Sequence, residues 1–348
     1  MKSLFRNARS VVRGSALASV LAVSTLMFTA CDVSDAGNGG DNAEGSGEIN
    51  LYTSEPEAKI NEVIDAFNKE NPDIQVKVFR AGTGELKTRI ASEKKSGKIG
   101  ADVLLAADVP TFEGFKSEHE LIKLDDVETD GIEKEQVDAD GYYVGTRIIP
   151  TVIAYNTDKV KEAPKSWAEL TDPKFKEQVA MPNPDVSGAA AFNTALWLDQ
   201  PELGEDWLKK LGENKPKVLE SNGPVAQAVA DGSSPLGVVV DYPVRDLADK
   251  GSPVAVSYPS DGVPYVNQPV GVFKDSENPD AAQAFVSFLV SKEGQELAVK
   301  QNYVPIRPDA GAPEGAPALT DINLIQPDYA KVKEQQDGAV EKFKEIMG

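Results

Sequence analysis

Hydrophobic positions along the first half of the chain change period in a regular order. Residues 49–53 and 74–79 alternate apolar and polar side chains, which is typical of β-strands. Between them, "EPEAKINEVIDAFNKENP" has apolar residues three and four positions apart, the spacing of an amphipathic helix. The nearly continuous apolar run "ADVLLAAD" is typical of a buried parallel strand. With helices over "GTGELKTRIASEKK" and "VPTFEGFKSEHELI", the order β-α-β-α-β-α predicts an open parallel sheet flanked by helices.

The second half continues this alternation. The β-rich segment "YYVGTRIIPTVIAYNT" is long enough to cross from one lobe to another. Residues 166–198 predict helix, strand, turn and helix, and residues 207–251 predict helix, short strand, helix, strand and helix. A β-rich stretch at 253–276 precedes an amphipathic helix pair at 278–302 and a terminal helix after residue 328.

A folded part of about 300 residues is larger than a single hydrophobic core usually supports, so two lobes are expected. The long β-rich segments are the natural places for the chain to pass between them. We predict lobe one from residues 49–146 and 256–310, and lobe two from residues 147–255. Residues 311–348 are expected to form a C-terminal loop and helix packed on the outside.

Residues 1–30 have the layout of a secretory signal peptide: a basic start, the apolar run "GSALASVLAVSTLMFTA", and small residues before Cys31. Cys31 is the only cysteine in the chain, so it has no disulfide partner within it. The stretch "FTAC" resembles the lipobox of bacterial lipoproteins, and the resemblance implies a lipid on Cys31. An ordinary secretion signal with an incidental cysteine is the alternative.

The segment that follows is polar and acidic. Residues 31–48 consist mainly of small and acidic residues without an apolar period, which predicts a flexible tether. No other apolar run approaches the roughly 20 residues that a membrane-spanning helix requires. We therefore expect an exported protein, lipid-anchored to the outer face of the cytoplasmic membrane. The formal net charge of −20 argues against a nucleic-acid partner.

Five segments together resemble the substrate-binding proteins of ABC importers: "ADVLLAAD", "YVGTRIIPTVIAYNT", "DPKFKEQVAMPNPDVSGAA", "VAQAVADGSSPLGVVVDY" and "AAQAFVSFLVSKEGQ". More narrowly, they are similar to the two-lobed group that includes ferric-iron, thiamine, phosphonate and sugar-phosphate binders. The resemblance implies a type II periplasmic-binding-protein-like α/β fold, with a mainly parallel sheet in each lobe and a hinge of crossing strands. It also implies a monomer without a cofactor that delivers a small solute to an ABC permease.

Ligands of such folds bind beyond the carboxyl ends of the parallel strands, where helices begin with unpaired N–H groups. Small residues at a helix start let a ligand approach the backbone, so converging helix starts would bind an anion without a positive surface. The alternative for these residues is plain helix capping or turn formation. Three predicted helix starts supply the candidate residues Thr53, Ser54, Gly82, Thr83, Gly84, Ser187, Gly188 and Ala189.

Further candidates follow other strands of the predicted sheets. Asp108 ends a core strand, and Asn222, with Gly223, opens a helix of lobe two. Asp241 and Tyr242 follow a buried strand. Each of these could instead cap a helix or form an ordinary turn. Weaker candidates are Arg245, Tyr265, Asn267 and Gln268, with Arg147 as a candidate hinge ion-pair residue.

The ligand can be narrowed by contrast with the ferric-iron branch. Resemblance to that branch would imply three features in the sequence: an adjacent Tyr-Tyr pair, a histidine in the first βα turn and a glutamate after the third strand. Here Tyr242 is followed by Pro243, the first turn reads "YTSEPEA", and the pair Tyr142-Tyr143 precedes the crossing strand. We therefore predict no direct metal site. The segment "YPSDGVPYVNQPVGV" resembles the organic phosphate and phosphonate branch and favours a small anionic solute.

Other ligands and functions remain as alternatives. Iron held together with an anion, and thiamine or its phosphates, stay open, although Trp167, Trp197 and Trp207 suit helix packing better than a cation-binding box. A secreted hydrolase is the remote alternative. His119 is the only histidine, and the S-x-x-K match at residues 92–95 lies at a lysine-rich helix end. We therefore expect a binding protein and not an enzyme.

Overall fold

The computed structural model describes residues 47–317 and 321–348. The predicted signal peptide, Cys31 and nearly all of the predicted tether lie outside the described residues. The described residues form one compact unit. The first strand begins at Gly47, two residues before the predicted start of lobe one. None of the helices in the described part of the chain is long and apolar enough to cross a bilayer.

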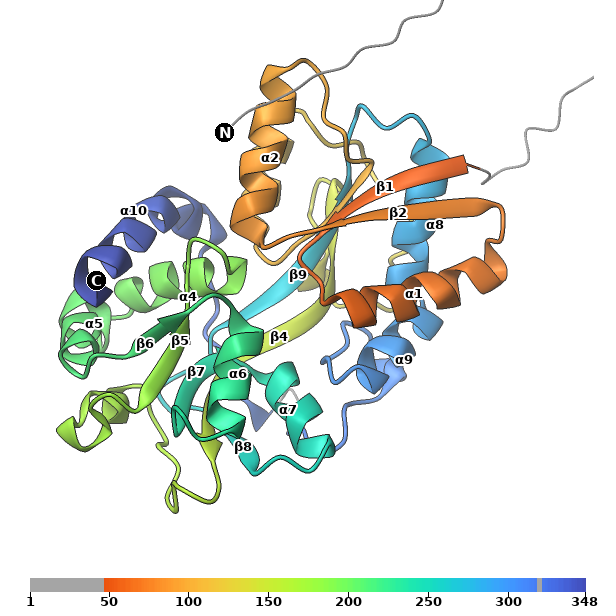
Figure 1. Ribbon diagram of the computed structural model, residues 1–348. Coiled ribbons are helices and arrows are strands. Elements are labelled where there is room, and N and C mark those ends of the chain that lie inside the picture. The colour runs from red at the N-terminus through yellow and green to blue at the C-terminus, as the bar shows by residue number, and fades with distance from the viewer. Residues whose placement is uncertain (1–46, 318–320) are drawn as a thin grey trace, which may run out of the picture. The chain divides into compact units, whose positions relative to one another are not determined.

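Lobe one begins with the predicted strand–helix alternation (Figure 1). Its strands are β1 (Gly47–Thr53), β2 (Ile74–Arg80) and β3 (Val103–Leu105), and β1 pairs in parallel with both neighbours. Its helices are α1 (Glu57–Glu70), α2 (Thr83–Lys95) and α3 (Val109–Ser117), joined late in the chain by α8 (Pro279–Val290) and α9 (Lys292–Lys300). The apolar stripe of α1 is buried, and its Phe67 packs edge-on against Phe285 of α8. The periodicity of the sequence therefore predicted the correct core face.

Two antiparallel strands lie between the parallel strands of the two lobes. Strand β4 (Tyr143–Asn156) pairs through its first part with β9 (Tyr265–Val272), and through residues 151–155 with a strand of lobe two. Strand β9 in turn pairs with β3. The long β-rich segment thus crosses between lobes as predicted, and the passage occurs near Thr151.

Lobe two repeats the arrangement of lobe one. Parallel strands β5 (Val179–Pro182), β6 (Lys217–Leu219) and β7 (Leu236–Val240) are accompanied by β8 (Val254–Ser257), which pairs with β4. The helices are α4 (Gly188–Asp199), α5 (Gly204–Glu213), α6 (Asn222–Ala230) and α7 (Asp241–Asp249). The sheet order is β2-β1-β3-β9-β4-β7-β5-β6, so each lobe has three parallel strands beside the shared antiparallel pair. This confirms the predicted fold class.

Two local predictions are wrong. The sequence pattern predicts an α-helix before β5, but the segment forms two short 3₁₀ helices, η2 (Ala168–Thr171) and η3 (Pro173–Phe175), because Pro173 cannot continue a helix. Helix α3 ends at Ser117, so His119 lies in the turn that follows, with a φ of 55°. Two further 3₁₀ turns are η1 (Lys134–Gln136) and η4 (Pro308–Ala310).

The terminal helix α10 (Tyr329–Met347) packs mainly on α4 and α5 of lobe two and also reaches α3 of lobe one. Its Phe343 is buried in the cluster that contains Trp167, Trp197 and Trp207. The ring centroids of Trp197 lie 5.1 Å from Trp167 and 5.5 Å from Trp207. The interpretation of the three tryptophans as packing residues agrees with this arrangement.

We predict that Phe343→Ala lowers the free energy of unfolding by about 3–5 kcal/mol, because it removes a buried ring from the tryptophan cluster. Urea denaturation would measure the loss. The matched control on the same helix is Glu341→Ala, whose side chain is 75% exposed and which should change stability by less than about 0.5 kcal/mol. Equal effects of the two substitutions would show that α10 does not complete this core.

The inter-lobe cleft as candidate functional site

A cleft of about 1070 Å³ lies where the two lobes face each other. Its walls include residues from the carboxyl ends of β1 and β2 and from the turns after β5, β6 and β7. Small-molecule sites of proteins typically have volumes of about 300–1,000 Å³, so the cleft can hold a metabolite with several waters.

Five helices begin at this cleft. Residues from the first turns of α1, α2, α4, α6 and α7 or from the positions just before them line it. The sequence predicted the first three of these starts as parts of one site. Each start presents N–H groups that have no partner within the helix and the positive end of a helix dipole. The convergence favours negative charge on a bound molecule.

Most candidate residues from the sequence line the cleft. They are Ser54, Gly82, Thr83, Gly84, Ser187, Gly188, Ala189, Asn222 and Tyr242, and the weaker candidates Gly223 and Gln268 also lie there. Ser187 also caps α4, since its hydroxyl accepts a hydrogen bond from the Ala190 N–H at 3.3 Å. The same hydroxyl accepts from the Asn222 side chain at 3.0 Å. Capping and lining the cleft are therefore compatible roles.

Three candidates do not line the cleft, because their side chains have partners inside the protein. The Thr53 hydroxyl accepts from the Glu55 N–H at 3.0 Å. Asp108 caps α3 through the Thr111 N–H at 2.7 Å, and burial raises the pKa of its carboxyl. Asp241 pairs with Arg245 at 2.6 Å. For these three residues the geometry favours the structural alternative over ligand contact.

Three weaker candidates are also occupied elsewhere. Arg245 donates to the Tyr258 hydroxyl at 2.8 Å and to the Asn302 carbonyl at 3.0 Å, in addition to its bond with Asp241. Tyr265 is buried in the core of lobe one. Asn267 accepts a hydrogen bond from Tyr329 of α10 at 3.3 Å. Their surroundings are structural rather than part of the cleft wall.

A buried cluster around Glu55 forms the base of the cleft, and sequence reasoning missed it. The Glu55 carboxylate lies 3.2 Å from the Arg147 guanidinium and accepts from Gln268 at 2.9 Å and from the Tyr303 hydroxyl. The register of β4 against β9 shifts between Gly145 and Ile148, and such a bulge re-aims side chains. The ion pair of Arg147 with Glu55 is of the kind predicted for a hinge residue.

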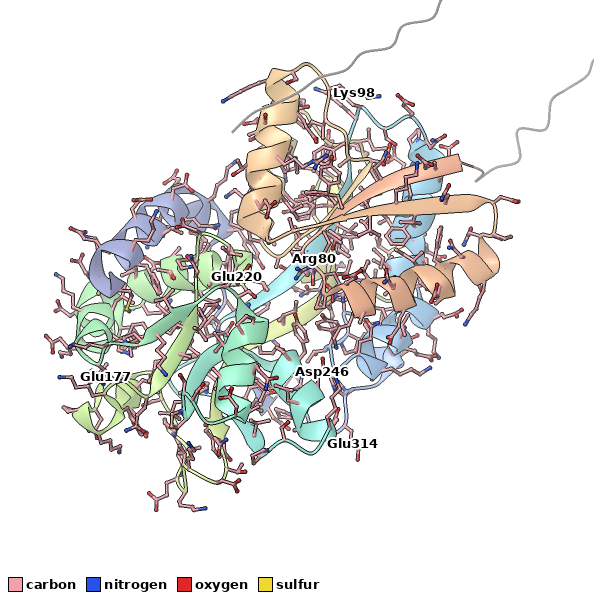
Figure 2. The ribbon with its side chains drawn as sticks, viewed as in Figure 1. Arg80, Lys98, Glu177, Glu220, Asp246 and Glu314 are labelled. Atoms are coloured by element: carbon pink, nitrogen blue, oxygen red, sulfur yellow. The ribbon has the colours of Figure 1, made fainter. Side chains whose placement is uncertain are left out.

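Two cations also line the cleft, and they differ in their partners. Lys59 of α1 pairs with Asp246 of α7 at 2.9 Å and lies over the rings of Tyr242 and Tyr303. Arg80, at the end of β2, is exposed at the edge of the cleft (Figure 2). It donates to the Glu55 carbonyl at 3.2 Å but has no carboxylate partner among residues 47–317 and 321–348. The sequence signal for this cleft residue was its position, because Arg80 is a cation that directly precedes the predicted helix start "AGTGEL".

Residues 62–322 match the family described as bacterial extracellular solute-binding protein. The chain belongs to this family. Its members bind small-molecule solutes and work with ABC permeases. The cleft between the lobes is accordingly the place to look for solute binding.

Several relatives cover most of the chain. A Haemophilus influenzae protein is 30% identical over 93% of this chain and 96% of its own length. The Fe(3+)-binding periplasmic protein of Serratia marcescens is 25% identical, covering 83% of this chain and 87% of that one. The putative 2-aminoethylphosphonate-binding periplasmic protein of Salmonella typhimurium is also 25% identical, covering 77% and 81%.

Solved structures confirm the type II periplasmic-binding-protein fold. The periplasmic binding protein AfuA from Actinobacillus pleuropneumoniae, with exogenous fructose-6-phosphate bound, superimposes with a TM-score of 0.79 at 24% identity, covering 88% of this chain and 99% of that one. Iron-bound HitA from Pseudomonas aeruginosa gives a TM-score of 0.74 at 26% identity, covering 86% and 99%.

We predict that Asp241 makes stability fall as the pH rises from about 4 to 6. Burial raises the pKa of Asp241 to about 6 despite the adjacent Arg245, whereas the ordinary value is 3.8. In that interval the native state holds a proton that the unfolded chain has released, so ionisation of the native carboxyl disfavours folding by about 1.4 kcal/mol per pKa unit.

The comparison is between the wild type and Asp241→Asn, by urea denaturation at about pH 4 and about pH 7, which enclose this interval. Since asparagine does not ionise, the variant should gain stability relative to the wild type as the pH rises. A stability difference that stays constant with pH would contradict the assignment.

Proposed function

We propose that the protein captures a small anionic solute, an organic phosphate or phosphonate, in the inter-lobe cleft and delivers it to an ABC permease. The observation that supports this most directly is the combination of five helix starts with Arg80, the lining cation that has no carboxylate partner among the described residues. Helix N–H groups and an arginine fork are both suited to oxyanions.

The other charged groups of the cleft are largely neutralised in pairs. Glu55 pairs with Arg147, Lys59 with Asp246, and Asp185 with Lys344 at 3.4 Å. Glu85 and Glu220 are exposed at the edge of the cleft. The interior of the cleft is therefore governed by helix ends and hydroxyls rather than by an excess of lysine, and Arg80 lies at its edge.

The names of the relatives include both kinds of ligand. The Salmonella protein is named for a phosphonate and the AfuA structure holds a sugar phosphate, whereas the Serratia and HitA proteins are named for or hold iron. In this chain the hard oxygen donors at the cleft are Tyr242 and several carboxylates, of which Glu55, Asp185 and Asp246 are already paired with cations. No group of three His, Cys, Asp or Glu side chains in the described residues could hold a metal ion. Oxyanion binding therefore suits this site better than direct iron binding.

The remaining parts of the proposal concern export and anchoring. A lipid on Cys31 and a polar tether would hold the binding unit at the outer face of the cytoplasmic membrane. The protein would act there as a monomer without turnover of its solute. The exposed position of its single histidine, in a turn and outside the cleft lining, suits a binding protein.

We predict that Arg80→Gln weakens binding of a phosphorylated ligand by roughly tenfold to a hundredfold, because it removes a charge-assisted hydrogen-bond donor worth about 1.5–3 kcal/mol. The purified protein would first be screened by thermal unfolding against phosphate, 2-aminoethylphosphonate, fructose 6-phosphate, citrate, ferric citrate and thiamine. A ligand at about 100 times its dissociation constant adds roughly 2.7 kcal/mol of stability. Calorimetry would then compare the affinities of the variants.

The matched control is Lys77→Gln, which removes an exposed cation of the same strand that pairs with Glu48 away from the cleft. It should leave the affinity unchanged. If only ferric citrate or thiamine raises the unfolding midpoint, the oxyanion proposal is wrong, while the family assignment stands. An equal loss of affinity in both variants would show that Arg80 acts only through the overall charge.

A further inference from the structure

The start of α2 in lobe one touches the turn before α4 in lobe two through the main chain. The Gly84 N–H lies 3.5 Å from the Val186 carbonyl oxygen. A Cβ atom built on Gly84 would lie only 1.8 Å from the Asp185 carbonyl oxygen. Because both partners are backbone, neither can move aside in the way that a flexible side chain can.

Two other glycines make the same kind of contact. A Cβ on Gly188 of α4 would lie 2.1 Å from the carbonyl oxygen of Ala107 in lobe one. A Cβ on Gly82 would lie 2.7 Å from the carbonyl oxygen of Val186 in lobe two. The three glycines therefore form a continuous inter-lobe contact, with partners drawn from both lobes.

The backbone conformation does not require glycine at these positions. None of Gly82, Gly84 and Gly188 has a positive φ. Gly84 and Gly188 lie in the first turns of helices, where glycine is less favourable than alanine by up to about 1 kcal/mol. The close approach of the opposite lobe is therefore a physical reason for residues without a side chain, in addition to the access that they give a ligand to the backbone.

The other side of the cleft is joined differently. Lys59 of α1 reaches Asp246 of α7, and Arg245 reaches the Asn302 carbonyl after α9. Long side chains can follow a small rotation of one lobe without losing contact. The backbone contact between α2 and the turn before α4 cannot adjust in this way, so it limits how closely the lobes approach each other.

We propose that Gly84 and Gly188 are positioning residues for solute capture: they permit the two lobes to meet, and thereby set the width of the closed cleft. A methyl group at either position would hold the lobes apart. The apparent affinity for any solute that contacts both lobes would then fall with the population of the closed state. The proposal depends on the capture of a solute between lobes, but not on which solute is bound.

The test compares Gly84→Ala with Gly114→Ala, a control in the same lobe that lies outside the cleft lining. Both glycines lie in helices, α2 and α3, so alanine should favour the helix in each. A Cβ on Gly114 would meet no other segment of the protein within 4 Å, so only Gly84→Ala should obstruct the lobes. Gly188→Ala is a second variant that obstructs the same contact from the other lobe.

The distance between lobes would be measured by pulsed electron paramagnetic resonance. Spin labels would be attached at S92C on α2 and Q227C on α6, two exposed positions, in a C31S background. Measurements would be made without ligand and with saturating phosphate, 2-aminoethylphosphonate, fructose 6-phosphate or ferric citrate. Thermal unfolding of each variant would show that the fold is retained.

We expect the wild type and Gly114→Ala to share a short-distance population that Gly84→Ala and Gly188→Ala lose in every condition. Affinity for a ligand that binds the wild type should fall at least about tenfold in the two obstructed variants. The proposal is overturned if Gly84→Ala keeps the short distance, or if the wild type never shows it. Neither result depends on Arg80 or on a phosphorylated ligand, so this test can fail independently of the proposed function.

Discussion

Strand β4 is the element on which both lobes depend. Its first part is hydrogen-bonded to β9 in lobe one, and residues 151–156 pair with β7 and β8 in lobe two. A chain that is paired on both sides of the passage cannot let either lobe unfold without disturbing the other. The same strand carries the bulge that directs Arg147 to Glu55, so the base of the cleft is built on the connection itself.

This connection explains how an acidic protein could hold the proposed oxyanion site. The net charge of −20 is carried mostly at the surface, while three of the carboxylates at the cleft, those of Glu55, Asp246 and Asp185, are matched to Arg147, Lys59 and Lys344. Parallel strands in both lobes point their carboxyl ends at the cleft, and all of them except β3 are followed by a helix that begins there. The positive field of the site thus arises from backbone geometry, and little of it is visible in the composition.

The sequence predicted the parts that depend on local periodicity and on strand–helix alternation. The helix starts at Ser54, Gly82–Gly84 and Ser187 follow from this, because the ends of parallel strands share one edge of a sheet. It did not predict Glu55, Lys59 and Tyr303, which are brought together from segments that lie far apart in the chain. The pairing of Asp241 with Arg245 was also missed, since an i,i+4 pair of charges looks the same whether the helix face is exposed or buried. Only the tertiary fold decides which of these side chains reaches the cleft.

Two of the contacts between the lobes at the cleft have small energies. The Lys59–Asp246 pair is partly exposed, and such pairs contribute about 0–1 kcal/mol. The glycine contact adds one long hydrogen bond at 3.5 Å and close packing of main-chain atoms. Helix α10 adds a further bridge, because it packs on α4 and also reaches α3 of lobe one. Neither of the two cleft contacts is by itself strong enough to hold the lobes together. A solute that contacts the helix starts of both lobes can therefore decide the equilibrium, because its differential affinity for the closed arrangement exceeds what the protein supplies alone. A capture protein thus requires small inter-lobe energies. The lobes come close enough to touch through their glycines, and the contact is weak enough for them to separate when the solute is released.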